Sequence, residues 1–170
     1  MKGYIQVYKG TGKGKTTAAF GLAVRALCAG MSVYIGQFVK SMKYNEDALD
    51  KKFEKLTIEQ LGDGCFIERD TRPKDSELAY AGLKKCREIM ASGKTDLVIL
   101  DEIGIAFYYD LLNEEDVIEA LKAKDYNCEV VLTGRVMPES IVEIADLVTD
   151  MKEVKHYYQK GVLSRNGIDH

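Results

Sequence analysis

Tryptophan is absent from the sequence, and proline and histidine occur only twice each. The four cysteines, Cys28, Cys65, Cys86 and Cys128, form no C-x-x-C pair, and only two histidines could join them. This spacing argues against a zinc site. We interpret the cysteines as reduced and mostly buried, as is usual in a cytosolic protein.

Long apolar runs and an excess of basic residues are also missing. No stretch approaches the ~18–20 apolar residues that a membrane-spanning helix needs, and the richest one, residues 18–31, is interrupted by Arg25. Residues 1–5 lead directly into a strand-like pattern, so we expect no signal peptide, no membrane partner and a cytoplasmic location. The net charge of −3 argues against nucleic acid as the main ligand.

The pattern of apolar residues predicts strands that alternate with helices. Continuous apolar stretches such as residues 97–100 are typical of parallel strands buried on both faces. Residues 41–55 are charged and only weakly periodic, so they could form a short helix or a loop. We expect a single domain over residues 1–170, in the α/β class, with a mainly parallel sheet and helices on both faces. The expected strands span residues 4–8, 32–39, 56–61, 97–100, 129–133 and 147–154. Four helices are expected. The first follows residue 14 and ends at Gly30, and the second begins at the cap Asp75 and ends at Gly93. The third runs from the cap Asn113 to Lys122, and the fourth runs from Pro138 to Ile144.

A loop rich in glycine and lysine follows the first expected strand. The phosphate-binding consensus is G-x-x-x-x-G-K-[ST]; Gly14, Lys15 and Thr16 match its end, but the first glycine, Gly10, lies one residue late. Such a loop curls its backbone N–H groups around a phosphate at the start of a helix. We therefore predict that it binds ATP, with Lys13 and Lys15 as cations and Thr16 as a ligand of Mg²⁺. The predicted ATP-binding residues are Gly10, Thr11, Gly12, Lys13, Gly14, Lys15, Thr16 and Thr17.

Two further strand ends carry candidate groups. Asp101 and Glu102 close the apolar strand at residues 97–100, where an acidic residue commonly binds the metal of a phosphate loop, so both are predicted metal ligands. Glu102 could instead activate water, as in a hydrolase. Arg135 follows the next buried strand and can reach a phosphate or pair with a surface acid. We predict Lys15, Arg135 and Glu102 as the catalytic residues.

Motifs along most of the chain resemble the ATP:corrinoid adenosyltransferase family. They begin with Gly12-Lys13-Gly14-Lys15-Thr16-Thr17 and continue with Gln37-Phe38-Val39-Lys40, Leu100-Asp101-Glu102-Ile103, Leu132-Thr133-Gly134-Arg135 and Glu153-Val154-Lys155-His156. The resemblance implies a RecA-like fold, a homodimer, and transfer of the 5′-deoxyadenosyl group of ATP to Co(I) of a corrinoid substrate with release of triphosphate. It also implies Mg²⁺, with Mn²⁺ as an alternative, and a flavoprotein as the reductant.

The same resemblance suggests where the corrinoid binds. Phe66 is expected to contact the lower face of the corrin ring, although it could instead anchor its own loop in the core. Residues 152–158, which include Lys155 and His156, are expected to line part of the active site. A mixed basic and aromatic run of this kind can also be a solvated edge.

Two other functions remain open from the sequence. One is an ATP-dependent kinase of a small hydroxyl substrate, which relies on similar parts. The other is a switch module that binds ATP without consuming it. Attack by Co(I) needs no general base, and the sequence offers no convincing Ser–His or Cys–His nucleophile arrangement. Positioning and electrostatics would then carry the catalysis, which favours the adenosyltransferase.

Overall fold

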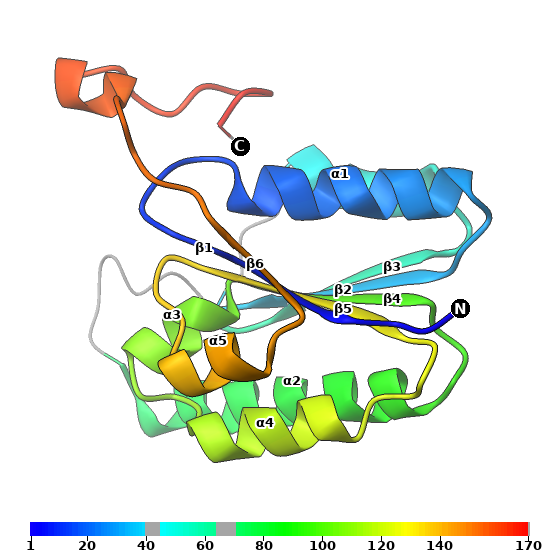
Figure 1. The fold of residues 1–170 in the computed structure, drawn as a ribbon. Coiled ribbons are helices and arrows are strands. Elements are labelled where there is room, and N and C mark those ends of the chain that lie inside the picture. Colours follow the sequence, from blue (N-terminus) through cyan, green and yellow to red (C-terminus); the bar gives the residue numbers. More distant parts are fainter. Residues whose placement is uncertain (40–44, 64–70, 170) are drawn as a thin grey trace.

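In the computed structural model, which describes residues 1–39, 45–63 and 71–169, six parallel strands form one sheet (Figure 1). Their order is β3-β2-β4-β5-β1-β6. The strands are β1 (Ile5–Lys9), β2 (Val33–Phe38), β3 (Leu56–Leu61), β4 (Leu97–Asp101), β5 (Glu129–Gly134) and β6 (Leu147–Asp150). Ligands of parallel α/β sheets bind beyond the carboxyl ends of the strands, so a ligand is expected near the ends of β1 and β4.

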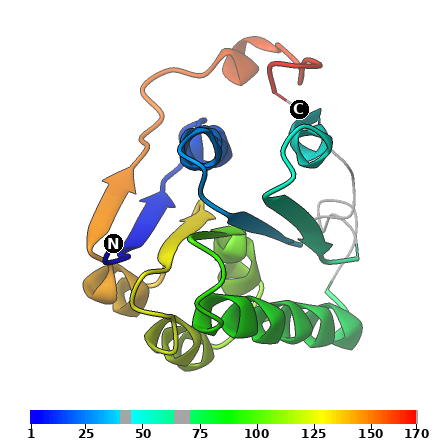
Figure 2. The ribbon, with the colours of Figure 1, turned by 90° about the vertical axis from the view of Figure 1, so that its right-hand side faces the viewer.

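Helices cover both faces of the sheet, as predicted. The helix α1 (Lys15–Cys28) and the 3₁₀ segment η1 (Asn45–Lys51) lie on one face (Figure 2). The opposite face carries α2 (Pro73–Ala91), α3 (Ile103–Tyr108), α4 (Glu114–Lys122) and α5 (Glu139–Ile144) (Figure 1). A last 3₁₀ segment, η3 (Tyr157–Lys160), lies in the C-terminal region away from the sheet. No helix among the described residues is long and apolar enough to cross a membrane.

Two apolar layers hold the sheet between its helices. On the α1 side, Phe20 and Ala23 of α1 pack against side chains of the sheet such as Ile35 of β2 and Ile99 of β4. On the other side, residues of α2 and α4 pack against Val98 and other side chains of the sheet. All five residues of β4 are buried, which confirms the interpretation of its apolar run as a strand covered on both faces.

Several predicted boundaries were wrong. The helix expected to begin at the cap Asp75 begins at Pro73, and Asp75 instead accepts a hydrogen bond from the backbone N–H of Arg72 at 2.7 Å. A proline fits the first helical turn because its missing N–H would have had no partner there. The last strand ends at Asp150 rather than residue 154. The helix α3 was not predicted, because its six residues continue an apolar run too short to show a helical period.

Candidate functional site

The glycine-rich loop joins β1 to α1 at the carboxyl edge of the sheet. Gly10 and Gly14 have φ angles of 120° and 118°, which lie in a region that side chains other than glycine rarely adopt. Gly14 is the N-cap of α1, and the helix begins at Lys15 with no acidic residue in its first turn. The positive end of the helix dipole and the N–H groups of this turn therefore face the loop, which is the arrangement that binds a phosphate.

The chain after β6 supports this loop from its outer side. The N–H of Gly12 donates to the carbonyl of Met151 at 2.7 Å, and the N–H of Met151 donates to the carbonyl of Lys9 at 2.7 Å. A Cβ atom at Gly12 would lie 2.7 Å from the same Met151 oxygen, which is closer than real contacts allow. Glycine is thus required here by the close approach of two backbone segments, and the loop is held in a fixed shape.

A network of hydroxyl and carboxylate groups forms the floor beside the loop. Asp101 is fully buried, and one of its oxygens, Oδ1, accepts hydrogen bonds from the hydroxyls of Thr16 and Thr133, each at 2.9 Å. Gln37, at the neighbouring position of β2, points its Nε2 at the other oxygen at 3.4 Å. The fold thus brings Thr16 and Asp101 together, as the sequence predicted. The roles of Thr133 and Gln37 were missed, although both lie at strand ends within quoted motifs.

Lys15 occupies the centre of this arrangement. Its Nζ donates to the carbonyl of Gly12 at 2.8 Å. Burial lowers the pKa of Lys15, and the charge of Arg135 lowers it further, whereas the carboxylates of Glu102 and Asp101 raise it. These four predicted site residues therefore lie within electrostatic reach of one another.

Arg135 and Glu102 border the loop in different ways. Arg135 is exposed. Its backbone carbonyl accepts a hydrogen bond from the N–H of Gly10 at 3.3 Å, so Arg135 lies directly beside the loop. Glu102 has a left-handed backbone with φ of 58°, and its N–H donates to the hydroxyl of Thr133 at 2.7 Å. This turn sends the chain from β4 into α3 and leaves Glu102 at the wall of a cavity.

That cavity has a volume of about 590 Å³ and opens beside the phosphate loop. Its size lies within the range of pockets that bind cofactors and small molecules. Residues from the phosphate loop, α1, η1, the end of β4 and the C-terminal segment line it. They are Lys13, Thr16, Thr17, Phe20, Asn45, Glu46, Leu49, Glu102, Gly167, Ile168 and Asp169.

The remaining predicted residues lie elsewhere or outside the described residues. Lys155 and His156 line a separate hollow of about 350 Å³ with Gly12 and Lys13. Lys155 is exposed, while His156 accepts a hydrogen bond from the N–H of Tyr158 at 3.1 Å and so caps η3. Phe66 lies outside the described residues, and its contact with a corrin ring stays a prediction.

Comparisons of the sequence with protein families and with individual proteins point to the same family. The family described as ATP:corrinoid adenosyltransferase BtuR/CobO/CobP matches residues 1–170. The corrinoid adenosyltransferase of Sinorhizobium sp is 37% identical over 99% of this chain and 80% of its own length. The corrinoid adenosyltransferase CobA of Salmonella typhimurium is 35% identical over 99% of this chain and 86% of its own length.

A solved structure resembles the fold alone. The flagellar accessory protein FlaH of Methanocaldococcus jannaschii superposes with a TM-score of 0.59 at 17% identity, over 88% of this chain and 71% of that one. Together with the parallel six-stranded sheet, this likeness confirms the predicted RecA-like α/β fold.

Proposed function

This chain belongs to the ATP:corrinoid adenosyltransferase family, and from that premise we propose how its residues transfer the 5′-deoxyadenosyl group of ATP to a corrinoid. The proposal places the triphosphate of ATP on residues 10–17, against the N–H groups at the start of α1. The observation that carries it is the floor beneath this loop, where Thr16 and Asp101 meet at 2.9 Å beside the half-buried Lys15. An anion site and a hard-oxygen site thus adjoin each other.

Adenosyl transfer is a displacement at the 5′ carbon of ribose. Co(I) supplies the electron pair that forms the new cobalt–carbon bond, and the bond from the carbon to the triphosphate oxygen breaks with its electrons. The nucleophile carries no proton, so no general base is needed. The enzyme must hold the reactants in line and stabilise the negative charge of the departing triphosphate. We assign that stabilisation to Lys13, Lys15 and Arg135.

We further propose that Mg²⁺, or Mn²⁺ in its place, accompanies ATP at this floor. The hydroxyl of Thr16 and the carboxylate of Asp101 are hard oxygen donors of the kind these ions prefer, and they already lie within hydrogen-bond distance of each other. Glu102, at the cavity wall, is the third proposed ligand. The cation would neutralise phosphate charge. The chain's own contribution is to aim these oxygens through the bond from Thr133 to Asp101.

The binding of the second substrate and of partners is also part of the proposal. We place Lys155, His156 and Phe66 on the corrinoid side of the site, and we propose a homodimer in the cytoplasm with a flavoprotein as the reductant. Support for the homodimer is that the edge strand β6 exposes Leu147 and Val148, with 45% and 39% of their surface accessible. Apolar side chains on an exposed strand edge favour association with another chain.

Product identification tests the proposal. The protein is incubated with ATP, Mg²⁺ and a chemically reduced Co(I) corrinoid, and the products are separated by chromatography. We expect an adenosylated corrinoid and inorganic triphosphate in equal amounts. Formation of ADP, as from a kinase, or recovery of unchanged ATP, as from a switch module, would overturn it. Omitting the reductant is the matched control, because Co(II) lacks the required electron pair.

A further inference from the structure

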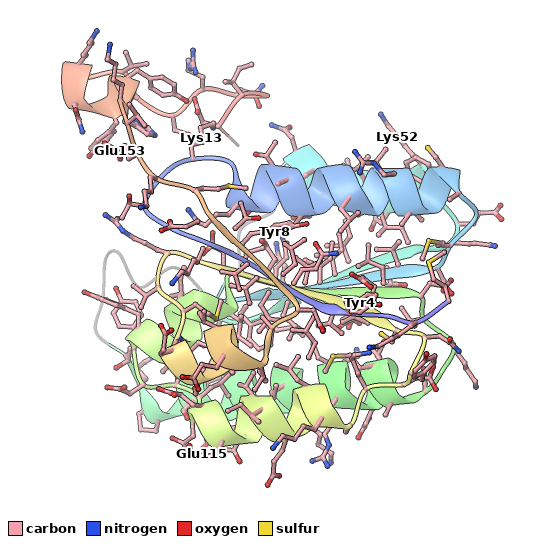
Figure 3. All side chains as sticks on the ribbon, viewed as in Figure 1. Tyr4, Tyr8, Lys13, Lys52, Glu115 and Glu153 are labelled. Carbon is pink, nitrogen blue, oxygen red and sulfur yellow. The ribbon has the colours of Figure 1, made fainter. Side chains whose placement is uncertain are left out.

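Residues 168 and 169, near the C-terminal end of the chain, return to the phosphate loop. Lys13 donates from Nζ to the carboxylate of Asp169 at 2.5 Å and to the carbonyl of Ile168 at 2.9 Å, across more than 150 residues of sequence. Figure 3 shows Lys13 on the loop below the C-terminal segment. We call residues 165–169 the C-terminal strap. Two of the three N–H donors of the Lys13 ammonium are thus used by the strap, which leaves one for another acceptor.

Asp169 is the residue that holds the strap together. Besides Lys13, its carboxylate accepts from the hydroxyl of Tyr157 and from the backbone N–H and Nε of Arg165 at 3.1 and 3.0 Å. The Arg165 guanidinium also lies over the Tyr157 ring, 4.6 Å from its centre. These donors hold the pKa of Asp169 well below its usual range, with the bonds from Lys13 and Tyr157 as the main causes. The carboxylate is therefore charged at neutral pH, and its bonds are of the stronger, charge-assisted kind.

The strap also forms one side of the cavity described above. Gly167, Ile168 and Asp169 line it together with Phe20 of α1 and Leu49 of η1. Next to these, Asn45 donates to the side chain of Asn166 at 2.6 Å, which joins the strap to η1. A ligand whose phosphates lie on the loop and whose remainder enters this cavity must therefore contact the strap.

We propose that the C-terminal strap is a wall of the nucleotide site, and that Asp169 is a positioning residue that holds both this wall and Lys13 in place for ATP. Two cations surround the one carboxylate, so the cluster of Lys13, Arg165 and Asp169 keeps a net positive charge toward a triphosphate. The bonds of Asp169 already order the side chains of Lys13 and Arg165 before ATP binds. Less rotamer freedom is therefore lost on binding, which favours higher affinity. The proposal rests on the proposed function only in taking ATP as the nucleotide.

The test measures ATP binding without any corrinoid, by titration calorimetry in the presence of Mg²⁺. We expect Asp169→Asn to weaken binding about tenfold, the loss of one charge-assisted contact. Truncation after Ser164 should weaken it further, since the wall itself is removed. Asp169→Glu keeps the carboxylate and should stay within about threefold of the parent. In the absence of ATP, the melting temperatures of all three should match the parent.

Glu59→Gln is the matched control, because Glu59 also accepts from a lysine, Lys85 at 2.6 Å, and from a tyrosine, Tyr34 at 2.7 Å, on the surface away from the loop. It should leave ATP affinity unchanged. Ile168→Ala, which shortens the wall without touching a charge, should weaken binding too and serves if the truncated chain does not fold.

Equal affinity of the parent, the Asp169→Asn variant and the Ile168→Ala variant would overturn the proposal. Tighter binding by Asp169→Asn would overturn it as well, since the carboxylate would then compete with phosphate for Lys13. These outcomes are independent of the proposed transfer reaction. A parent that binds ATP but forms no adenosylated corrinoid would refute that reaction and leave the strap measurement intact.

Discussion

Two aspartates near the phosphate loop are held in contrasting ways. Asp101, in the floor, is fully buried and accepts hydrogen bonds from two threonine hydroxyls, with the charge of Lys15 nearby. Asp169, in the C-terminal strap, is partly buried and accepts from Lys13 and Arg165, two cations whose side chains are 40% and 48% exposed. The floor is built from neighbouring strands of one sheet, whereas the strap reaches the loop from the far end of the chain.

This contrast separates a fixed part of the site from a detachable one. A buried carboxylate with neutral donors keeps its position because leaving it would cost its hydrogen bonds without a gain in solvation. The ion pairs of Asp169 depend instead on cations with long, exposed and flexible side chains, so they are easily screened by salt. We therefore expect changes in the floor to have large effects and changes in the strap to have graded ones.

The largest expected effect comes from Lys15 in the phosphate loop. Lys15→Ala should reduce ATP affinity by about a hundredfold or more, because a charge aimed at the phosphates is lost from a partly buried site. Its melting temperature without ATP should not fall, since burial disfavours the charged form of Lys15. Calorimetry and thermal unfolding measure the two quantities, and Lys85→Ala is the control for loss of a lysine elsewhere. Near-normal turnover of Lys15→Ala would refute the assignment.

Thr133→Val probes the floor itself. The change keeps the shape of the side chain but removes a hydroxyl that donates to Asp101 and accepts from the N–H of Glu102. Two buried groups lose a partner, so the free energy of unfolding should fall by about 2 kcal/mol. Urea denaturation measures it. The same change at the exposed Thr149 of β6 should stay within about 0.5 kcal/mol of the parent, and an equal loss at both positions would contradict the special role of the floor.

Glu102→Gln distinguishes a metal ligand from a hydrolytic base. Because Glu102 is proposed as a metal ligand at the cavity wall, removing its charge should lower the Mg²⁺-dependent rate about tenfold. This loss corresponds to about 1.4 kcal/mol of activation free energy. Raising the Mg²⁺ concentration should recover part of the rate. The variant should not accumulate bound ATP, because adenosyl transfer activates no water. Rapid ATP hydrolysis by the parent without corrinoid, abolished in this variant, would show that Glu102 is a base.

Salt should produce the smallest effect, and within the candidate site it should affect the strap and not the floor. The N–H of Asp169 donates to the carbonyl of Arg165 at 2.8 Å, and the N–H of Glu102 donates to a hydroxyl in the floor. Raising NaCl from about 0.05 to 0.5 M shortens the screening length to well below 10 Å and weakens the surface ion pairs. Hydrogen exchange at Asp169 should then quicken about threefold, while exchange at Glu102 stays unchanged. Equal acceleration at both amides would contradict the distinction.

Much of the fold was predictable because its signals are local. Apolar runs and alternation located all six strands, and the motif around Lys15 and Thr16 located the phosphate loop. The short helix α3 was missed because its six residues are too few to show a helical period. A Cβ at Gly104 in this helix would lie 2.6 Å from the Cα of Gly134, so two glycines let α3 approach the end of β5.

The candidate site was predictable in part. The sequence analysis assigned Thr16 and Asp101 to one metal site, and the fold brings them within 2.9 Å of each other because the carboxyl ends of parallel strands meet at one edge of a sheet. It did not predict that Thr133 would link Asp101 to the backbone of Glu102. That role requires the order β4-β5, which follows from packing and not from any residue pattern. The assignments of Phe66, Lys155 and His156 to the corrinoid remain predictions.

By itself, the sequence determined the parallel α/β layers, the phosphate loop with its lysines, and the pair of acids at the end of a buried strand. Each of these arises from residues close together in the chain, where backbone geometry and side-chain period leave few alternatives. Only the tertiary structure decided that Asp101 faces Thr16 while Glu102 lines the cavity, and that Asp169 reaches Lys13 across 156 positions. The reason is that the course of the chain after β6 is set by its contacts with the loop, and contacts between distant segments leave no periodic trace in the sequence.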